Sequence, residues 1–131
     1  FFHTAFGYLL EEKHPDQWRK GEKDDKDIIC IDDDRLSFEI KTSSSINRIY
    51  ANRSYGQQEV KGRKSKDGYY LAVNFTKVQD LTEETYSSGV RLVRFGWLEH
   101  TDWKPQRSST GQQSHLEPET YDLKFVTLYQ E

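Results

Sequence analysis

The sequence predicts a single domain that combines helices with β-strands, of the α/β or α+β class, and three patterns support this. Apolar residues recur at helical spacing through residues 2–13. Residues 35–41 alternate strictly between polar and apolar side chains, and residues 69–76 and 90–98 are rich in aromatic and β-branched types. These patterns are typical of an amphipathic helix, a half-buried strand and two further strands. A length of 131 residues suits one domain, so we predict a single domain over residues 1–131.

The composition is that of a globular protein in a reducing compartment. With 34% hydrophobic and 31% charged residues, the chain can bury a core and is not of the disordered class. No apolar run approaches the ~18 residues of a membrane span, so we expect no membrane partner. The single cysteine, Cys30, cannot form an internal disulfide, which suits the cytoplasm. The chain starts at Phe1 and has no methionine, so we expect it to be part of a slightly longer chain.

The first expected element is a helix over residues 2–13, followed by a loop. One face of this helix carries Phe2, Ala5, Phe6, Leu9 and Lys13, with Leu10 beside it. Pro15 disfavours helical backbone at His14, so the helix should end there. Residues 15–26 are mostly polar, contain Gly21, and are expected to form a loop.

Residues 27–41 are expected to form a β-hairpin. Residues 28–31 are apolar and mostly β-branched, and the three aspartates at 32–34 favour a turn. A three-residue turn centred on Asp33 pairs residues whose numbers add to 66. The expected cross-strand pairs are Ile31 with Arg35, Cys30 with Leu36, Ile29 with Ser37, Ile28 with Phe38 and Asp27 with Glu39.

This register separates an apolar face of the hairpin from a charged one, because successive side chains of a strand point to opposite faces. The apolar face carries Ile28, Cys30, Leu36, Phe38 and Ile40. Asp27, Glu39 and Lys41 share the other face. A slip of one residue would spoil both faces, so the core and the charged residues specify the same pairing.

The three charged residues form a candidate site for phosphodiester hydrolysis. Facing carboxylates at Asp27 and Glu39 repel each other, and a divalent cation resolves that conflict. Mg²⁺ prefers one or two carboxylates together with water and substrate phosphate oxygens. Lys41 can reach the same pocket to orient a water, help deprotonate it, or neutralise charge on a phosphate. The simpler interpretation is a surface hairpin with a solvated pair of Glu39 and Lys41, and the hairpin alone leaves both open.

The rest of the chain is expected to alternate between loops, strands and short helices. The expected elements are a Ser/Thr loop at 42–46, a helix at 47–61, a basic turn at 62–68, strands at 69–76 and 90–98, a short helix opening at 82–84, a long polar loop at 99–115, and a strand or short helix at 121–129. The helix at 47–61 would carry Ile49, Tyr50, Arg53 and Gln57 near one face.

Charge is distributed unevenly along the chain. Residues 22–34 contain seven acids and two lysines, net −5, whereas residues 47–66 contain six basic residues and one acid, net +5. An acidic segment next to a basic one suits a metal site beside a phosphate track. The overall net charge of −3 favours the alternative of two solvated surface segments.

The stretch from Asp27 to Lys41 resembles the signature of the PD-(D/E)XK nuclease superfamily, with Lys26 where a proline often stands. The resemblance implies a restriction-endonuclease-like fold, a mixed β-sheet flanked by helices. It also implies that Asp27, Glu39 and Lys41 surround Mg²⁺, for which Mn²⁺ can substitute. The departure at Lys26 puts little in doubt, because the proline of the signature is not a ligand.

Three further stretches, Glu39–Ser44, Asn52–Gln57 and Gly96–Trp103, resemble the ScaI-type restriction endonucleases. This resemblance spans most of the chain. It implies a prokaryotic type II restriction-like enzyme that cleaves double-stranded DNA as a homodimer.

The resemblance implies two further members of the site. In such nucleases an acid from the helix before the hairpin often joins the metal ligands, and Glu11 is the expected residue. Gly7 lies four residues earlier on the same helix face, where its bare backbone would let the helix approach the sheet. Glu12 is the rival to Glu11. Gln57 is implied to face the site and hold a water or a phosphate, although an ordinary polar role for it stays open.

Hydroxyl and cationic side chains near the hairpin are the candidates for contacts with DNA phosphates. They are Ser43, Ser44, Arg48, Arg53, Lys61, Arg63 and Lys64. Two other functions stay open: a catalytically inactive DNA-binding module of the same fold, and a nuclease that acts on RNA or on DNA junctions.

Overall fold

The computed structural model describes residues 2–57, 65–77, 80–81, 89–107 and 111–131. In chain order, the elements there are α1 (Phe2–Lys13), β1 (Trp18–Lys20), β2 (Ile28–Cys30), the 3₁₀ turn η1 (Asp34–Leu36), β3 (Phe38–Ser43), β4 (Tyr50–Asn52), the 3₁₀ turn η2 (Arg53–Gly56), β5 (Gly68–Phe75), β6 (Val90–Leu98), the 3₁₀ turn η4 (His100–Asp102), β7 (Trp103–Pro105), β8 (Gln113–Leu116), α2 (Pro118–Lys124) and β9 (Phe125–Gln130). Neither helix in these ranges is long and apolar enough to cross a membrane.

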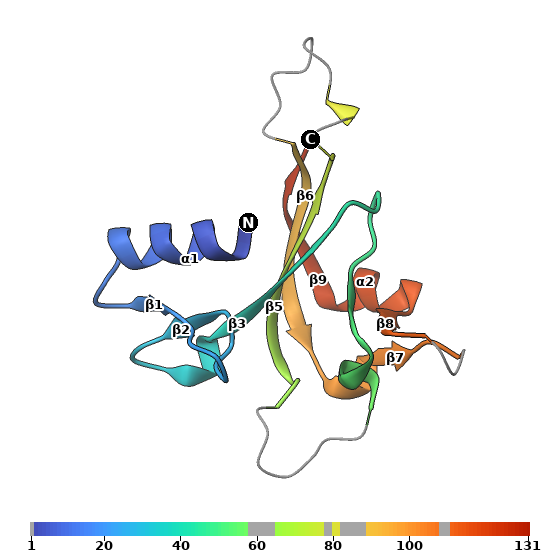
Figure 1. The fold of residues 1–131 in the computed structure, drawn as a ribbon, viewed down its shortest axis with the longest axis horizontal. Coiled ribbons are helices and arrows are strands. Elements are labelled where there is room, and N and C mark those ends of the chain that lie inside the picture. Colours follow the sequence, from blue (N-terminus) through green and yellow to red (C-terminus); the bar gives the residue numbers. More distant parts are fainter. Residues whose placement is uncertain (1, 58–64, 78–79, 82–88, 108–110) are drawn as a thin grey trace.

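The strands form a large mixed sheet and a small antiparallel one. The large sheet has the order β1-β2-β3-β5-β6-β9, with β3 and β5 parallel and the other neighbours antiparallel. The small sheet has the order β4-β8-β7. Helix α1 lies on one side of the central strands, whereas α2 and the small sheet lie on the other (Figure 1). The expected mixed sheet flanked by helices is confirmed.

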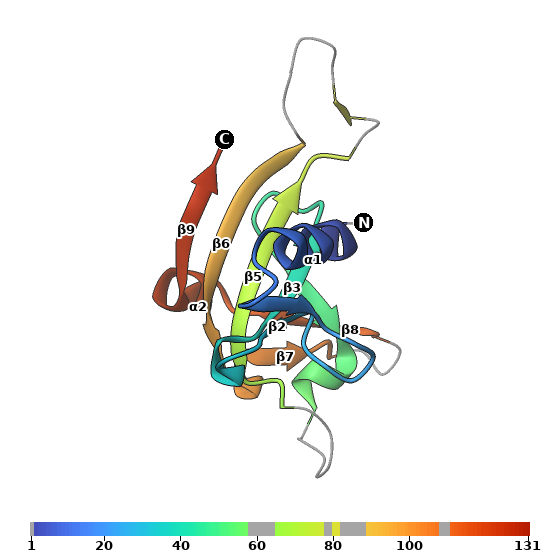
Figure 2. The ribbon, with the colours of Figure 1, turned by 90° about the vertical axis from the view of Figure 1, so that its left-hand side faces the viewer.

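Helix α1 packs across the large sheet and covers the first of two cores (Figure 2). This core consists of Ile28, Phe38, Ile40, Leu71 and Val73, with Phe2, Phe6 and Leu10 of α1 packed against it. Gly7 is the buried residue of α1, and a Cβ there would lie 3.2 Å from Cγ of Lys20. The expected close approach of the helix at Gly7 is therefore confirmed, but Leu9 is exposed and Leu10 takes its place in the core.

The second core lies between the large sheet and the small one. It consists of Ile49, Ala51, Tyr55, Tyr70, Ala72, Leu98, Trp103 and Leu116. Tyr70 and Ala72 belong to β5, where they alternate with Leu71 and Val73 of the first core. Strand β5 is thus apolar on both faces, as a central strand between two packed layers must be.

The hairpin register is confirmed where β2 and β3 pair, because Ile28 lies opposite Phe38. The turn is different from the expected one. Asp33 caps η1 by accepting a hydrogen bond from the backbone N–H of Arg35, so the loop is longer than three residues and the expected strand over 35–41 begins only at Phe38. Leu36 consequently faces solvent and not the apolar face.

Ser37 completes this longer turn in place of regular strand pairing. Its hydroxyl accepts a hydrogen bond from the backbone N–H of Cys30 at 2.9 Å and donates one to Asp34 at 3.0 Å. Side-chain bonds of this kind compete with ladder bonds, which is why the run of aspartates ends the pairing early.

Three other expectations about the elements are wrong. The expected loop at 15–26 contains β1, in which Trp18 pairs with Cys30. The expected helix at 47–61 is β4 and η2 as far as the structure describes it, and 58–61 lie outside that part. The expected loop at 99–115 contains η4, β7 and the start of β8, because buried Trp103 anchors it to the second core.

The remaining expectations are confirmed in whole or in part, or lie outside the described residues. The loop expected at 42–46 begins only after Ser43, where β3 ends, and the basic turn expected at 62–68 is described from residue 65 and ends where β5 begins at Gly68. The strands expected at 69–76 and 90–98 are β5 and β6. The region 121–129, expected as a strand or a short helix, contains the end of α2 and most of β9. The short helix expected at 82–84 lies outside the described residues.

Candidate active site

The structure brings Asp27 and Glu39 to the same region, as the register predicts. Asp27 immediately precedes β2, and its Oδ2 accepts a hydrogen bond of 2.7 Å from the backbone N–H of Ile40 in β3. Glu39 is 5% exposed, although it is charged. We refer to Asp27 and Glu39 as the carboxylate pair.

Lys41 lies beside the carboxylate pair, next to a tyrosine from the small-sheet side. Its ammonium nitrogen is 4.1 Å from the ring centroid of Tyr55, which belongs to η2. The charges of Glu39 and Asp27 both act on the Tyr55 hydroxyl. Glu39 and Lys41 are thus two residues apart on β3, Asp27 bonds the backbone of Ile40 between them, and the Tyr55 ring lies against Lys41.

The buried tyrosines of this pocket stay neutral. Burial, followed by the negative charges of Glu39 and Asp27, raises the pKa of Tyr55 well above its usual value. Burial is also the main cause that raises the pKa of Tyr70, which lies opposite Glu39 on β5. Neither phenol can therefore serve as a base near neutral pH, and both act as rigid, uncharged walls.

The carboxylate pair fits a small divalent cation, with no third acidic ligand from the described residues. In that part of the chain no three His, Cys, Asp or Glu side chains gather as a metal-binding group. Mg²⁺ commonly takes only one or two carboxylates and completes its shell with water and phosphate oxygens. Two carboxylates, one of them buried, therefore match the donor set that this ion needs.

Glu11 does not join the carboxylate pair. Its Oε2 accepts a hydrogen bond of 3.4 Å from the backbone N–H of Lys20 in β1, and the side chain is exposed. Glu12 is exposed as well. The reason is the direction of α1, which packs against β1 and so places Glu11 at the backbone of Lys20.

Gln57 lies at the end of η2 and not on a helix. It is exposed and lines a cavity of about 370 Å³ with His100, Thr101 and Lys104. The lining of that cavity does not include Asp27, Glu39 or Lys41.

An open cleft of about 840 Å³ begins at Lys41. Its lining includes residues 41–45 at the end of β3 and beyond it, residues 50–52 of β4, and Gln112 and Gln113. His3 at the start of α1 also lines the cleft, and its Nε2 lies 2.8 Å from the carbonyl oxygen of Ile40. The cleft connects the charged face of the hairpin with the small sheet.

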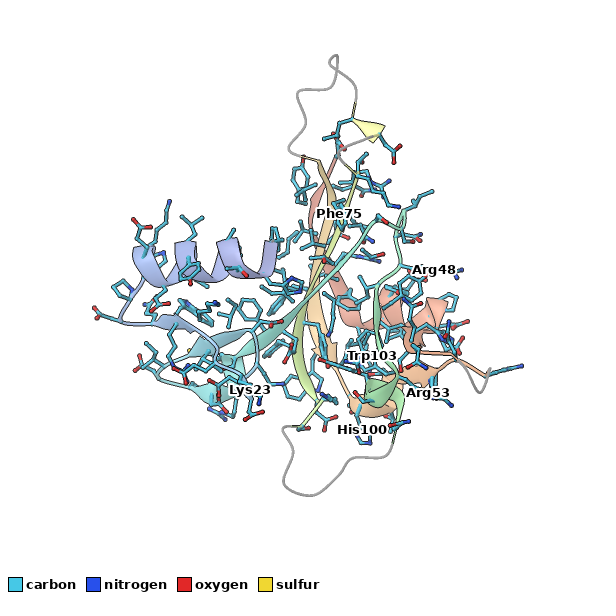
Figure 3. All side chains as sticks on the ribbon, in the orientation of Figure 1. Lys23, Arg48, Arg53, Phe75, His100 and Trp103 are labelled. Carbon is cyan, nitrogen blue, oxygen red and sulfur yellow. The ribbon has the colours of Figure 1, made fainter. Side chains whose placement is uncertain are left out.

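The residues predicted to contact DNA are divided between different places. Ser43 and Ser44 line the cleft. Arg48 and Arg53 lie on the side of α2 and the small sheet (Figure 3). Arg48 is exposed there, whereas Arg53 donates a hydrogen bond of 3.0 Å to the carbonyl of Gly111. Lys61, Arg63 and Lys64 lie outside the described residues.

A buried asparagine holds the loop that follows β3. Nδ2 of Asn74 donates hydrogen bonds of 3.0 Å to the carbonyls of Ser45 and Arg48, and its Oδ1 accepts one of 3.0 Å from Arg94. Arg91 donates a further bond of 2.8 Å to the Ser45 carbonyl. The loop that carries the cleft serines is therefore fixed from β5 and β6.

Sequence reasoning missed Tyr55 and Asn74, and also Lys66, whose ammonium nitrogen lies 4.2 Å from the ring centroid of Tyr55. Asn74 interrupts an otherwise apolar strand, and a polar residue at a core position is a usable signal of a specific hydrogen-bonding role. Lys66 was noticed only as part of a basic segment. Tyr55 lies in a stretch expected to be helical, and the resemblance of Asn52–Gln57 to the ScaI-type enzymes assigned no role to this tyrosine.

Comparison with known proteins identifies the family of this chain. The profile of the ScaI restriction endonuclease family matches residues 1–129. The chain is 42% identical over 121 residues to the type II restriction enzyme ScaI of Streptomyces caespitosus, and the alignment covers 86% of this chain and 52% of that enzyme. The chain thus spans about half the length of this relative. No solved structure matches. Because the family profile covers nearly all of its residues, the chain belongs to the ScaI restriction endonuclease family.

Proposed function

We propose that this chain carries the catalytic site of a Mg²⁺-dependent endonuclease of the PD-(D/E)XK type, which hydrolyses phosphodiester bonds of double-stranded DNA as a type II restriction enzyme. The observation that carries the proposal is that Asp27 bonds the backbone of β3 between Glu39 and Lys41, and that Lys41 also lines an open cleft. The relative of 42% identity, a type II restriction enzyme, supports it independently.

In this proposal Asp27 and Glu39 hold Mg²⁺, and Mn²⁺ can substitute for it. The bound ion supplies positive charge that polarises the phosphate and lowers the pKa of water. A water gives up a proton to solvent as its oxygen forms a bond to phosphorus. The bond from phosphorus to the leaving oxygen breaks, and that oxygen keeps the electron pair and takes up a proton from solvent. Lys41 orients the attacking water and neutralises negative charge that grows on the phosphate.

The DNA is proposed to lie along the cleft that begins at Lys41. Ser43 and Ser44 offer hydroxyl groups to backbone phosphates there. Asn52, Gln112 and Gln113 line the opposite part of the cleft with amide side chains, which suit contacts with sugars or base edges. Glu11 and Gln57 have no part in this proposal, because neither is found with the carboxylate pair.

A homodimer is part of the proposal. One carboxylate pair serves one phosphodiester bond at a time, whereas a break in duplex DNA needs a cut in each of two antiparallel strands. A two-fold dimer presents two identical sites related by the same symmetry as the two strands.

Plasmid cleavage tests the proposed function. Supercoiled DNA is incubated with the protein and Mg²⁺, Mn²⁺ or a chelator, and Lys41→Ala is compared with wild type. We expect cleavage with either ion, none with the chelator, and retained DNA binding but a loss of cleavage of at least about 100-fold in Lys41→Ala. Failure to cut DNA with any divalent ion would overturn the proposal, and full activity of Lys41→Ala would remove this lysine from the mechanism.

A further inference from the structure

Two lysine ammonium groups lie over the ring of Tyr55. The ring centroid is 4.1 Å from Nζ of Lys41 and 4.2 Å from Nζ of Lys66. Both distances are well inside the ~6 Å within which a cation is attracted to the face of an aromatic ring. Lys41 belongs to β3 and Lys66 precedes β5, so the ring contacts ammonium groups from two different segments of the chain.

The ring of Tyr55 is held rigidly from the small-sheet side. It is buried in the second core and makes an edge contact with Trp103, with ring centroids 5.6 Å apart. The next residue, Gly56, packs so closely that a Cβ there would lie 2.6 Å from the backbone nitrogen of Pro105. Its N–H donates a hydrogen bond of 3.1 Å to Ser114. A buried, fixed ring attracts a cation more strongly than an exposed one.

The backbone around Lys66 is held as well. The carbonyl of Lys66 accepts a hydrogen bond of 2.6 Å from the hydroxyl of Tyr70. The carbonyl of Asp67 accepts one of 2.9 Å from Nζ of Lys26, and its carboxylate accepts one of 2.6 Å from the N–H of His100. Lys26, which stands in the place of the common proline, thus ties the start of the hairpin to the segment that carries Lys66.

The carboxylate pair lies beside Lys41, because Glu39 stands two residues before it on the same face of β3 and Asp27 accepts a hydrogen bond from Ile40 between them. We propose that Tyr55 is a positioning residue that holds the ammonium groups of Lys41 and Lys66 at the carboxylate pair, and that Lys66 is a second cation for the reaction. This inference rests on the proposed function. It assigns a task to two residues that the Glu-x-Lys motif does not include.

The task of Lys66 is to contact the phosphate under attack. As the water oxygen bonds to phosphorus and the bond to the leaving oxygen breaks, negative charge moves onto the phosphate oxygens and the leaving oxygen. A preorganised ammonium group stabilises that charge without reorganising at the moment of reaction. Tyr55 contributes indirectly, because its ring keeps both ammonium groups in place.

Nuclear magnetic resonance of the metal-free protein tests the geometry without any activity. When a lysine ammonium group lies over an aromatic ring, its adjacent ε-methylene protons lie in the shielding region of that ring. We expect two lysine ε-methylene signals shifted upfield, both in wild type and in Tyr55→Phe. These shifts should be larger than that of Lys20, whose ammonium nitrogen lies 4.7 Å from the ring centroid of Tyr8. Both shifts should vanish in Tyr55→Leu, and one should vanish in Lys66→Ala. Unshifted signals in wild type would overturn the inference.

Single-turnover cleavage tests the function of Tyr55 and Lys66. Tyr55→Leu and Lys66→Ala should each lower the rate constant on the order of 100-fold, while DNA affinity without metal changes less than about threefold. Tyr55→Phe should restore most of the rate lost in Tyr55→Leu, because it keeps the ring. Tyr8→Leu and Lys20→Ala are matched controls from a second lysine and tyrosine contact outside the site, and should cut like wild type.

The outcomes separate this inference from the proposed function. A wild-type protein that cuts DNA, together with a folded Lys66→Ala that cuts equally well, overturns the role of Lys66 and leaves the proposed function intact. A wild-type protein that never cuts DNA overturns the proposed function, and the resonance experiment still decides the geometry. Thermal unfolding verifies that each variant folds. If Tyr55→Leu does not fold, the wild-type spectrum and the Lys66→Ala variant decide the outcome.

Discussion

At the scale of single residues, the carboxylate pair is an unfavourable arrangement in the free protein. Glu39 is buried, and Asp27 lies at the same face with a like charge. The hydrogen bond from Ile40 to Asp27 and the nearby ammonium groups offset part of this cost. Functional sites often hold such arrangements, because the ligand that binds there reverses the cost.

This view predicts the effect of Asp27→Asn on stability. An amide removes one negative charge, and its oxygen can still accept the hydrogen bond from Ile40. We expect an unfolding midpoint in chelator at least as high as that of wild type, and loss of the rise in midpoint that Mg²⁺ gives to wild type. Calorimetry with and without Mg²⁺ measures both, with Asp32→Asn, an exposed acid of the same hairpin, as control. A Mg²⁺-dependent rise that persists in Asp27→Asn would contradict this role.

At the scale of elements, the loop after β3 depends on side chains from β5 and β6 more than on its own sequence. Asn74 is fully buried and bonds two loop carbonyls as well as Arg94. Burial lowers the pKa of Arg94, but its guanidinium donates hydrogen bonds to Asn74 and to the carbonyl of Asn47. The cleft wall that carries Ser43 and Ser44 is therefore positioned by hydrogen bonds from side chains of the large sheet.

Asn74→Ala tests this dependence. The change leaves two loop carbonyls and the Arg94 guanidinium short of a partner, and each such loss costs about 1–3 kcal/mol. We expect the free energy of unfolding to fall by on the order of 3 kcal/mol, and DNA affinity to fall as the serine loop loosens. Chemical denaturation and a binding titration measure the two effects. Gln130→Ala, at an exposed position of β9, is the control. An equally small effect of both changes would show that Asn74 is not needed to hold the loop after β3.

At the scale of the whole molecule, the site lies where two layers meet. The hairpin, which packs against α1 on its apolar face, supplies the carboxylate pair and Lys41. The second core, shared with the small sheet, supplies Tyr55. The cleft runs between these layers, so its width depends on how the small sheet docks on β5. The site therefore requires the complete fold and not the hairpin alone.

The proposed homodimer predicts how mixed subunits cut. Wild type and Lys41→Ala are unfolded together, refolded as a mixture and incubated with supercoiled plasmid. Dimers with one intact site should cut one strand, so nicked circles should accumulate as the share of Lys41→Ala rises. Gel electrophoresis separates nicked from linear DNA. A constant proportion of linear product at every mixing ratio would indicate that one chain cuts both strands.

The sequence by itself determined the local features of the site. Period-two alternation specified which side chains share a face over residues 38–41, where the strand forms, and the pairing of Ile28 with Phe38 agrees with it. The same alternation separated Asp27, Glu39 and Lys41 from the apolar core. Long apolar strands such as β5 and β6 were also predictable, since their composition does not depend on distant partners.

Only the tertiary structure decided which distant residues complete the site. The direction of α1 keeps Glu11 at β1, and the docking of η2 on the second core brings Tyr55 to Lys41 and Lys66. Short strands such as β1 and β7 form because Trp18 and Trp103 bury their rings against other segments. Such contacts join residues far apart in the chain, so no local pattern encodes them, and their stabilisation appears only once the two layers pack.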